Sequence, residues 1–274
     1  MAKKINLLNI GLCVLIIFII LAIFTPVMNL KDPLIINLSQ RFAPIGTANH
    51  LLGTDNLGRD LLSRLIWGAR PSLIIGLVPI VIGIIISSIL GGLAGYKRGY
   101  IEIIIMRILD IILALPPVFL AITIAAILGP GLKNMLFALT FILIPPMTRV
   151  VYQEIIRTSN LLFIDAAKIT GASTARIIFI HILPNSISTL LAYGASVAGL
   201  GIVLGAGLSF IGLGIQPPDP DWGQTINGGR SALIKAPHVA LLPGLGILIL
   251  SFSFNLIADG LRDINSPTQK ESIF

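Results

Sequence analysis

The residues best suited to chemistry are four polar side chains inside long apolar runs. Arg107 and Asp110 stand three apart, and Asn255 and Asp259 stand four apart. Both spacings place the two side chains on one face of a helix, where the first pair can form an ion pair and the second can hydrogen-bond to a neighbouring helix. Ionisable groups in apolar surroundings mark transport pathways or hold a helix bundle together. For Arg107 and Asp110, bundle packing is the preferred interpretation, and a pathway role stays open.

Motifs for enzyme chemistry are absent from the sequence. A phosphate-binding loop needs Gly directly before Lys, and none of the eight lysines follows a glycine. The chain has no nucleophile elbow, no His-Glu-x-x-His and no Cys-x-x-Cys. Its three histidines, His50, His181 and His238, are too scattered to suggest a metal cage. We therefore expect no catalytic residue, no metal site and no cofactor on this chain.

The composition identifies the surroundings in which the chain folds. Of its 274 residues, 55% are hydrophobic and 11% are charged, far from the balance of a soluble domain. The net charge of +7 is spread thinly along the chain, which argues against a nucleic-acid partner and for loops that face anionic lipid. The single cysteine, Cys13, excludes a disulfide within the chain. These features predict an integral membrane protein in contact with lipid.

Apolar runs long enough to cross a membrane define the expected fold. A helix needs about 20 mostly apolar residues to span the hydrocarbon core, and the runs lack the alternation of barrel strands. The sequence thus predicts an all-α polytopic protein with six spans, whose first run is a retained anchor and whose two termini are cytoplasmic. The spans cover about Ile5–Val27, Ser72–Tyr96, Ile103–Leu128, Met135–Val151, Ile187–Leu213 and Val239–Ala258.

Two of the expected spans contain adjacent prolines, and a third contains several glycines. Pro116 and Pro117 should kink or break the third span, and Pro145 and Pro146 the fourth, because proline removes a backbone donor and clashes with the preceding turn. Small residues let helices approach closely. We expect such close packing in the fifth span, which contains Gly194, Gly199, Gly201, Gly205 and Gly207.

The polar-and-apolar stretch IDAAKITGASTARIIFIHILPN, residues 164–185, separates the fourth and fifth spans. Its residues favour a short helix over Leu161–Ile169, a turn at Gly171, and a second short helix capped by Ser173 or Thr174 that ends before Pro184. Two short helices across the cytoplasmic membrane surface would result. From these residues alone, a docking element for another protein and an amphipathic loop resting on lipid are equally open.

This stretch resembles the cytoplasmic signature of permease subunits of ATP-binding-cassette importers. That signature contains a Glu-Ala-Ala triplet, a Gly four positions after it and a late Leu-Pro, and here Asp165 replaces the usual Glu. In the family, the segment is the pair of coupling helices that docks into a groove of the ATPase subunit. The resemblance implies that role for Asp165, Ala166, Ala167, Lys168, Gly171, Arg176, His181, Leu183, Pro184 and Asn185.

Further segments resemble the dipeptide, oligopeptide and nickel branch of the family. They are HLLGTDNLGRDLLSRLIWGARPSL (residues 50–73), LSFIGLGIQPPDPDWGQTINGGR (208–230) and FNLIADGLRD (254–263). The branch implies an external element that helps to seat a binding protein. It comprises Gly53, Thr54, Asp55, Gly58, Arg59, Asp60, Ser63 and Arg64.

The external segments also have an interpretation without the family. Asp55 could be a local cap of a turn before a helix, and Arg59, Asp60 and Arg64 could form ion pairs on an amphipathic external helix. The prolines of PPDPDWG predict an irregular loop, and Trp222 suits the membrane interface.

The resemblance implies a type I importer permease fold with two parts. Residues 1–70 would form the anchor and external segment, and residues 71–274 the permease core with its coupling loop at 152–185. The implied partners are a homologous second permease subunit, two ATPase subunits that bind ATP and magnesium, and an extracellular or periplasmic substrate-binding protein. The implied location is the bacterial inner (cytoplasmic) membrane. Peptides are the first choice of substrate, and nickel or another metal chelate is the second.

A transporter of a different class, driven by an ion gradient, is the rival interpretation. Such a secondary transporter would need no ATPase partner. The two classes differ in whether the chain forms a stable complex with a protein that contains a phosphate-binding loop.

Overall fold

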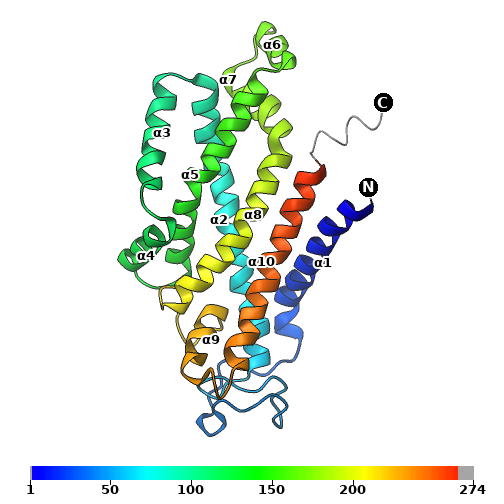
Figure 1. The fold of residues 1–274 in the computed structure, drawn as a ribbon, viewed down its shortest axis with the longest axis vertical. Coiled ribbons are helices and arrows are strands. Elements are labelled where there is room, and N and C mark those ends of the chain that lie inside the picture. The colour runs from blue at the N-terminus through cyan, green and yellow to red at the C-terminus, as the bar shows by residue number, and fades with distance from the viewer. Residues whose placement is uncertain (1, 265–274) are drawn as a thin grey trace.

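A computed structural model describes residues 2–264, with side chains from Leu7 onward, and Lys270 of the expected cytoplasmic tail lies outside the described residues. Long helices run roughly along one axis of the molecule (Figure 1). They are α1 (Ala2–Phe24), α2 (Leu61–Lys97), α3 (Tyr100–Leu113), α5 (Leu132–Ser159), α8 (Leu183–Phe210) and α10 (His238–Ile264), whereas α4 (Pro117–Leu128) lies across this direction. Shorter helices are α6 (Leu162–Ile169), α7 (Thr174–Arg176) and α9 (Trp222–Gly229), with single turns at Thr25–Val27, Leu38–Gln40 and Arg230–Ala232.

Five of the described helical segments are long and apolar enough to cross a membrane, and the third expected span would be the sixth. That span is broken: α3 and α4 meet at an angle of 85° across residues 114–116. Pro116 and Pro117 explain the break, because Pro117 sits at the start of α4, where its missing N–H costs nothing. The expectation of a break here is confirmed. In α5, by contrast, the helix continues through Pro145 and Pro146.

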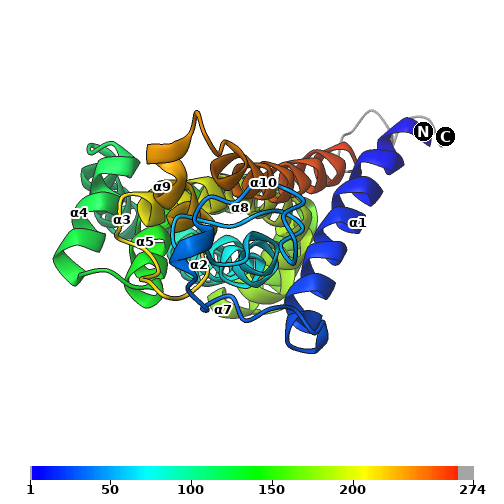
Figure 2. The same cartoon turned by 90° about the horizontal axis from the view of Figure 1, so that it is seen from below.

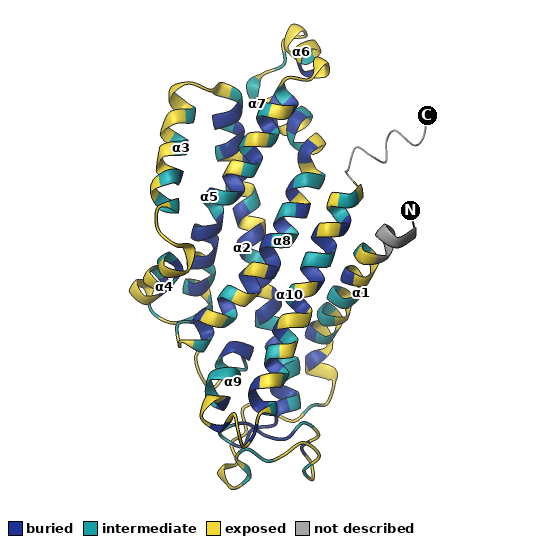
Figure 3. Ribbon diagram, in the orientation of Figure 1, coloured by how far each residue is buried: buried dark blue, intermediate teal, exposed yellow. Residues whose placement is uncertain are grey.

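The core lies where α2, α5, α8 and α10 pack together. Leu139, Ile142 and Ile202 are among its buried side chains. Buried residues follow the facing sides of these helices, whereas α3, α4 and α6 are largely exposed (Figure 3). Seen from the end that holds the segment before α2, α1 lies at one edge beside α10, and α3 and α4 lie at the opposite edge (Figure 2). Residues 70 and 71, the expected boundary between the two parts, both lie within α2.

The glycines of α8 allow two neighbouring helices to come close, as expected. A Cβ at Gly199 would lie 2.8 Å from the carbonyl oxygen of Ser251 in α10, and one at Gly205 would lie 2.3 Å from the side chain of Ile75 in α2. The Ser251 hydroxyl donates to the carbonyl of Gly199 at 2.9 Å, which is a contact only closely packed helices can make. Gly207 faces open space and has no such role.

Candidate coupling loop and external anchor

The two candidate functional regions lie at opposite ends of the bundle. The loop with α6 extends from one end, on the side toward which the start of α1 and the end of α10 point (Figure 1). The segment 25–60 and α9 lie at the other end. This arrangement places the candidate coupling loop at the same end as the start of α1 and the end of α10, with the family motif of residues 53–64 at the opposite end.

Local backbone chemistry shapes the coupling loop. Gly171 ends α6 with a φ of +80°, a conformation that glycine adopts without strain. The N–H of Gly171 donates to the carbonyl of Lys168 at 3.0 Å, and that of Ala172 to the carbonyl of Ala167 at 3.1 Å. This pair of bonds is a Schellman motif. Ser173 caps α7 by accepting from the N–H of Arg176 at 3.3 Å, so the expected turn and cap are both confirmed.

One face of α6 anchors the loop to the bundle. Ile164 is fully buried in a cluster that joins the end of α5 to residues 177–190. Ala167 and Ala172 pack against the same cluster. Ala167 therefore packs on its own chain, and Ala166 is the exposed alanine of the triplet.

The opposite face of α6 is apolar and exposed. Leu162 and Ile169 are each 87% exposed, and they flank Ala166 on this outward face. At the edge of the face, Asp165 accepts a bond from Lys168 at 2.9 Å, and both side chains remain about half exposed. The shorter carboxylate at position 165 is thus engaged within its own helix. Arg176 is exposed on α7.

The second short helix does not end before Pro184, which corrects the expectation from sequence. Residues 174–210 form one continuous helical segment, with a π-helical turn at Ile177–Ile182. A π turn is wider than an α turn and gives room for a proline ring that would otherwise clash with the preceding carbonyls. His181 and Leu183 are half-buried along this segment, and Asn185 donates to the carbonyl of His181 at 2.6 Å. The coupling loop is therefore joined to α8 without a break.

The external motif is a buried loop that leads into α2, and not the amphipathic helix expected from sequence. Asp55 accepts from the N–H groups of Leu57 at 2.8 Å and Arg59 at 3.0 Å, so it organises a turn. The cap of α2 is Asp60, which accepts from the N–H of Ser63 at 2.9 Å. Arg59 does form an ion pair, but its partner is Asp55, at 2.7 Å, and not Asp60.

Two glycines of this loop have no space for a side chain. Gly53 has a φ of +78°, and a Cβ there would lie 2.3 Å from the carbonyl oxygen of Ala43. Gly58 has a φ of +75°, and a Cβ would lie 1.8 Å from the carbonyl oxygen of Asn37. Thr54 is fully buried and donates to the carbonyl of Gln40. The glycines of the Gly-Thr-Asp and Gly-Arg-Asp motifs therefore keep the external segment tightly folded.

Arg64 connects three parts of the external surface. The side chain is 1% exposed, and its Nη1 donates to the carbonyls of Pro33 at 3.0 Å and Pro218 at 3.2 Å. Its Nη2 donates to the carbonyl of Asp219 at 3.4 Å. Its Nε lies 3.3 Å from the Asp55 carboxylate and has no hydrogen-bond partner, so this contact is electrostatic. Arg64 thus ties α2 to the segments before and far beyond it.

His50 and Ser63 complete the external anchor, which is the bonded network of residues 50–64 that holds the segment before α2 in place. The Nδ1 of His50 lies 2.8 Å from the Asp60 carboxylate, and its Nε2 lies 3.0 Å from the side-chain oxygen of Gln40. The hydroxyl of Ser63 donates to the carbonyl of Lys31 at 2.5 Å. The polar residues of the motif thus bond within the external segment or tie it to the start of α2.

Trp222 is a buried wedge and not the interfacial residue expected from sequence. The side chain is 3% exposed, and its Nε1 donates to the carbonyl of Leu65 at 2.9 Å. The ring fits against Gly68 and Gly246, where no side chain blocks it. The adjacent Asp221 caps α9 by accepting from the N–H of Gln224 at 2.8 Å, and burial raises the pKa of its carboxyl above the ordinary value. The prolines before it form the expected irregular loop.

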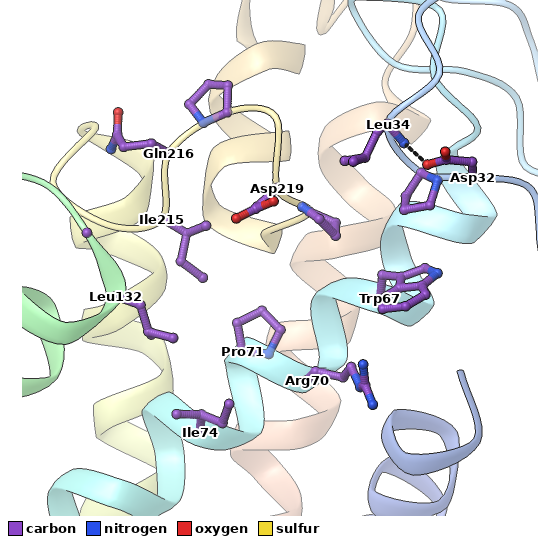
Figure 4. A pocket seen from close by; sticks show the side chains of 14 residues that line it. Asp32, Leu34, Trp67, Arg70, Pro71, Ile74, Leu132, Ile215, Gln216 and Asp219 are labelled. Atoms are coloured by element: carbon purple, nitrogen blue, oxygen red, sulfur yellow. Dashed lines mark hydrogen bonds between the residues drawn. The ribbon is translucent and has the colours of Figure 1, made fainter. Parts of the chain in front are cut away.

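An apolar pocket of about 670 Å³ lies between α2, the start of α5 and the proline-rich loop. Trp67, Pro71 and Ile74 line it from α2, and Leu132 and Ile215 close the other side (Figure 4). The Asp219 side chain points toward the centre of the pocket, and Asp32 and Arg70 lie at the pocket's margin (Figure 4). The pocket is therefore an apolar hollow with charged groups of both signs at the external end of the bundle.

The charged residues within the spans have other partners than the sequence suggested. Asp110 pairs with Arg149 of α5, and Arg107 does not pair with it. Asp259 pairs within its own helix with Arg262 at 3.4 Å, so the expected bond across helices is not formed. Asn255 is half-buried and points at Gly199 of α8. Among the described residues, no group of three His, Cys, Asp or Glu side chains is placed to hold a metal.

Sequence reasoning missed two interhelical contacts between α3 and α5. One is the bond of Arg149 to Asp110, and the other is the bond that the Tyr152 hydroxyl donates to Glu102. The sequence held a signal for the contact of Arg149, since Arg149 is the one ionisable residue of the fourth expected span, Met135–Val151. No local spacing rule predicts either contact, because the partners are 39 and 50 residues apart.

Comparison with known proteins identifies the class to which this fold and these loops belong. Residues 83–271 match the family described as "binding-protein-dependent transport system inner membrane component". The chain belongs to this family, the permease subunits of ATP-binding-cassette importers. It is a multi-pass inner membrane protein, and the transport systems of the family work with an ATPase and a substrate-binding protein.

Individual relatives narrow the resemblance. The chain is 40% identical to the dipeptide transport system permease protein DppC of Alkalihalophilus pseudofirmus, over 98% of this chain and 88% of that one. It is 42% identical to the glutathione transport system permease protein GsiD of Pectobacterium atrosepticum, over 81% and 73%. The fold is similar to that of the inward-facing MetNI methionine ABC transporter, with a TM-score of 0.58, 17% identity, and coverage of 73% and 97%.

Proposed function

We propose that this chain forms half of the pore of an ATP-driven importer of di- and oligopeptides. The other half would be a homologous second permease subunit. Two ATPase subunits that bind ATP and magnesium would drive it from the cytoplasm, and a binding protein would deliver peptide from outside. Family membership supports the importer, and relatives whose names include dipeptide and di/tripeptide transport support the substrate. A nickel or metal-chelate importer is the second candidate for the substrate.

We propose that the outward face of α6 is the surface through which ATP hydrolysis acts on the pore. Leu162 and Ile169 project from the bundle on either side of Ala166, while Ile164 holds the other face of the helix in the core. An exposed apolar face on a soluble surface loop needs a partner. A groove on the ATPase is the partner that the resemblance implies. The small Ala166 at the centre lets that surface approach closely.

The continuous segment from α7 to α8 supports the transmission of force. Coupling between two sites needs an element that both sites bias. The loop is joined to α8 by the π turn and to α5 by the buried cluster around Ile155 and Ile177, so a movement of α6 would displace both spans. We assign residues 152–185 to the coupling loop on these grounds. We also propose that residues 1–70 supply the anchor with the external segment and residues 71–274 the permease core, with α2 continuous across the boundary.

The external anchor suits a seat for the binding protein. Its buried network around Asp55 and Arg64 makes the outer surface rigid, and a rigid surface loses little entropy on docking. The apolar pocket beside it lies where peptide would be released. Neither of these roles requires chemistry on this chain, so it contributes no catalytic residue to the importer.

Replacing Ala166 by Arg tests the coupling proposal. A long charged side chain at the centre of the outward face should keep the subunit folded but prevent close docking. We expect loss of the co-purifying ATPase, or at least a tenfold fall in the ATPase stimulation by peptide-loaded binding protein, since about 1.4 kcal/mol of lost docking energy produces that factor. The assay uses the complete complex in liposomes.

Asn160→Arg is the matched control, because residue 160 is exposed just before α6 and outside its outward face. It should retain both the complex and the stimulation. An Ala166→Arg complex with normal assembly and normal stimulation would refute the coupling role. A stable complex that imports nickel chelates and no peptide would favour the second candidate substrate instead.

A further inference from the structure

The pocket of about 670 Å³ beside the proline-rich loop has the size of a small-molecule site. Its walls are mostly apolar and come from segments that lie far apart in the chain. Trp67, Pro71 and Ile74 project from α2, Leu132 begins α5, and Ile215 belongs to the loop (Figure 4). A single side chain from another protein would leave most of this space empty. The pocket therefore suits a small ligand that has an apolar part.

Three charged side chains line the pocket, and two of them are engaged within the chain. Arg70 donates to the carbonyl of Ala22 at 2.7 Å, and its guanidinium lies over the Trp67 ring, 5.2 Å from the ring centroid. Asp32 accepts from the N–H of Leu34 at 2.8 Å. One arginine against two aspartates gives the lining a formal charge of −1. The charge of the lining therefore favours a cation as the ligand.

Asp219 is the third charged group, and its side chain points toward the centre of the pocket (Figure 4). The buried Arg64 holds the loop by its backbone, because the guanidinium donates to the carbonyls of Pro218 and Asp219. Arg64 attracts the Asp219 carboxylate over a longer distance. Within residues 7–264, that carboxylate accepts no hydrogen bond and forms no salt bridge. The fold therefore fixes the loop and leaves this carboxylate free to bind a ligand.

We propose that this pocket receives the N-terminal residue of the imported peptide. The α-ammonium group binds Asp219, and the first side chain packs against Trp67, Pro71 and Ile74. The proposal rests on the proposed function of peptide import. An ammonium group has donors and no acceptor, so it matches a carboxylate that the chain leaves without a hydrogen bond. Every peptide with a free N-terminus carries this group, mostly protonated at neutral pH, whatever its side chains.

The walls and the exposure of the pocket suit a site that binds peptide and then releases it. The rings of Trp67 and Pro71 are rigid apolar surfaces, which lose little conformational entropy when a ligand packs against them. Because the pocket is larger than one side chain, it accepts first residues of different shape. Asp219 is exposed, so its contact with the ammonium group is screened by water and stays weak. A weak contact lets the peptide move on.

Photolabelling tests whether a peptide occupies the pocket. The probe is benzoylphenylalanyl-dialanine, a tripeptide whose first side chain bonds to neighbouring C–H groups under ultraviolet light. The importer complex of permease and ATPase subunits is labelled in nanodiscs without the binding protein, and the digested chain is mapped by mass spectrometry. We expect labelling at residues 67–74 of α2. The N-acetyl form of the probe should need about a tenfold higher concentration, because acetylation removes the ammonium charge.

Substitutions at Asp219 test the contact with the ammonium group. Asp219→Asn should raise the concentration for half-maximal labelling by the free probe about tenfold, and leave that of the N-acetyl probe unchanged. Asp219→Glu, which keeps the carboxylate, should recover part of the loss. Asp32→Asn removes the other aspartate of the lining, which lies at the margin and already accepts from Leu34, so its effect should stay below about threefold. Equal effects of Asp32→Asn and Asp219→Asn would overturn the assignment.

The outcomes separate this site from the proposed function. Equal labelling by the free and N-acetyl probes would overturn the ammonium site, while uptake of trialanine by the same complex in liposomes would still support peptide import. An Asp219→Asn complex that labels normally but needs more binding protein for half-maximal ATPase stimulation would also overturn it, and would assign Asp219 to the seat of the binding protein. A wild-type complex that takes up no trialanine with the binding protein present would refute both proposals.

Discussion

Single residues act in this chain mainly by holding backbone together. Arg64 contacts the carbonyls of Pro33, Pro218 and Asp219, so one buried guanidinium joins segments more than 150 residues apart. Its planar fork of donors can reach several acceptors at once, whereas a lysine ammonium is a point charge on a flexible stem. The residue types of the external family motif therefore follow from the contacts that hold the external segment to α2.

Arg64→Lys should therefore destabilise the folded protein. We expect a loss of about 2–4 kcal/mol, because the buried carbonyls and Asp55 lose donors that lysine cannot replace. Thermal unfolding of the detergent-purified subunit measures the change. Arg41→Lys is the control, since Arg41 is exposed and makes a single bond to the carbonyl of Asn56. Equal melting temperatures for the two variants would contradict the anchoring role of Arg64.

At the scale of elements, the coupling loop is defined by how α6 ends. The Schellman motif at Gly171 reverses the chain, and the Ser173 cap starts the next helix within three residues. The result is an α6 with one face in the buried cluster and one face outward. A different C-terminus of α6 would turn its outward face, even with every exposed side chain unchanged.

Gly171→Ala should loosen this loop without a steric clash. No atom lies within 4 Å of the position of the added Cβ, so the cost comes from the φ of +80° alone and is about 1 kcal/mol. Hydrogen exchange of residues 162–176 should become roughly fivefold faster. Gly171→Asn should have a smaller effect, because asparagine tolerates this conformation better than alanine. Exchange rates that do not change in Gly171→Ala would show that the turn is not what orders α6.

The whole bundle depends on close approach between α8 and its neighbours. Gly205 faces Ile75 of α2, and Gly199 faces Ser251 of α10. In a membrane, helices associate through van der Waals packing and hydrogen bonds, since lipid is as apolar as the helix surface. Small residues at these crossings therefore decide how tightly the core packs.

Gly205→Ala should lower stability by about 1–3 kcal/mol, because the new methyl group overlaps Ile75 and must push α2 away. Gly207→Ala, two residues further along the same helix, meets open space and should be neutral or slightly stabilising. Thermal unfolding of both variants in the same detergent makes the comparison. A Gly207→Ala variant as unstable as Gly205→Ala would refute the packing argument.

Membrane insertion and the order of the elements could be predicted from the sequence alone. Apolar runs of spanning length, the break at Pro116 and Pro117 and the turn at Gly171 follow from local physics, which depends on residues close in the chain. The role expected for residues 164–185 came from the resemblance to the family signature. That signature could be found in the sequence because its small and polar residues lie close together in the chain.

Partners across the chain were decided by the tertiary structure. Asp110 bonds to Arg149 and not to the nearby Arg107, the Asp55 network replaces an amphipathic helix, and Trp222 is buried under Leu65. The contacts of Asp110 and Trp222 depend on which helices pack side by side, and contacts over 39 and 157 residues leave no periodic pattern in sequence. The sequence by itself determined that the chain enters a membrane and where it turns. Packing decided that Asp110 meets Arg149 of another helix, because a charge in apolar surroundings is stabilised by whichever partner the fold brings within reach.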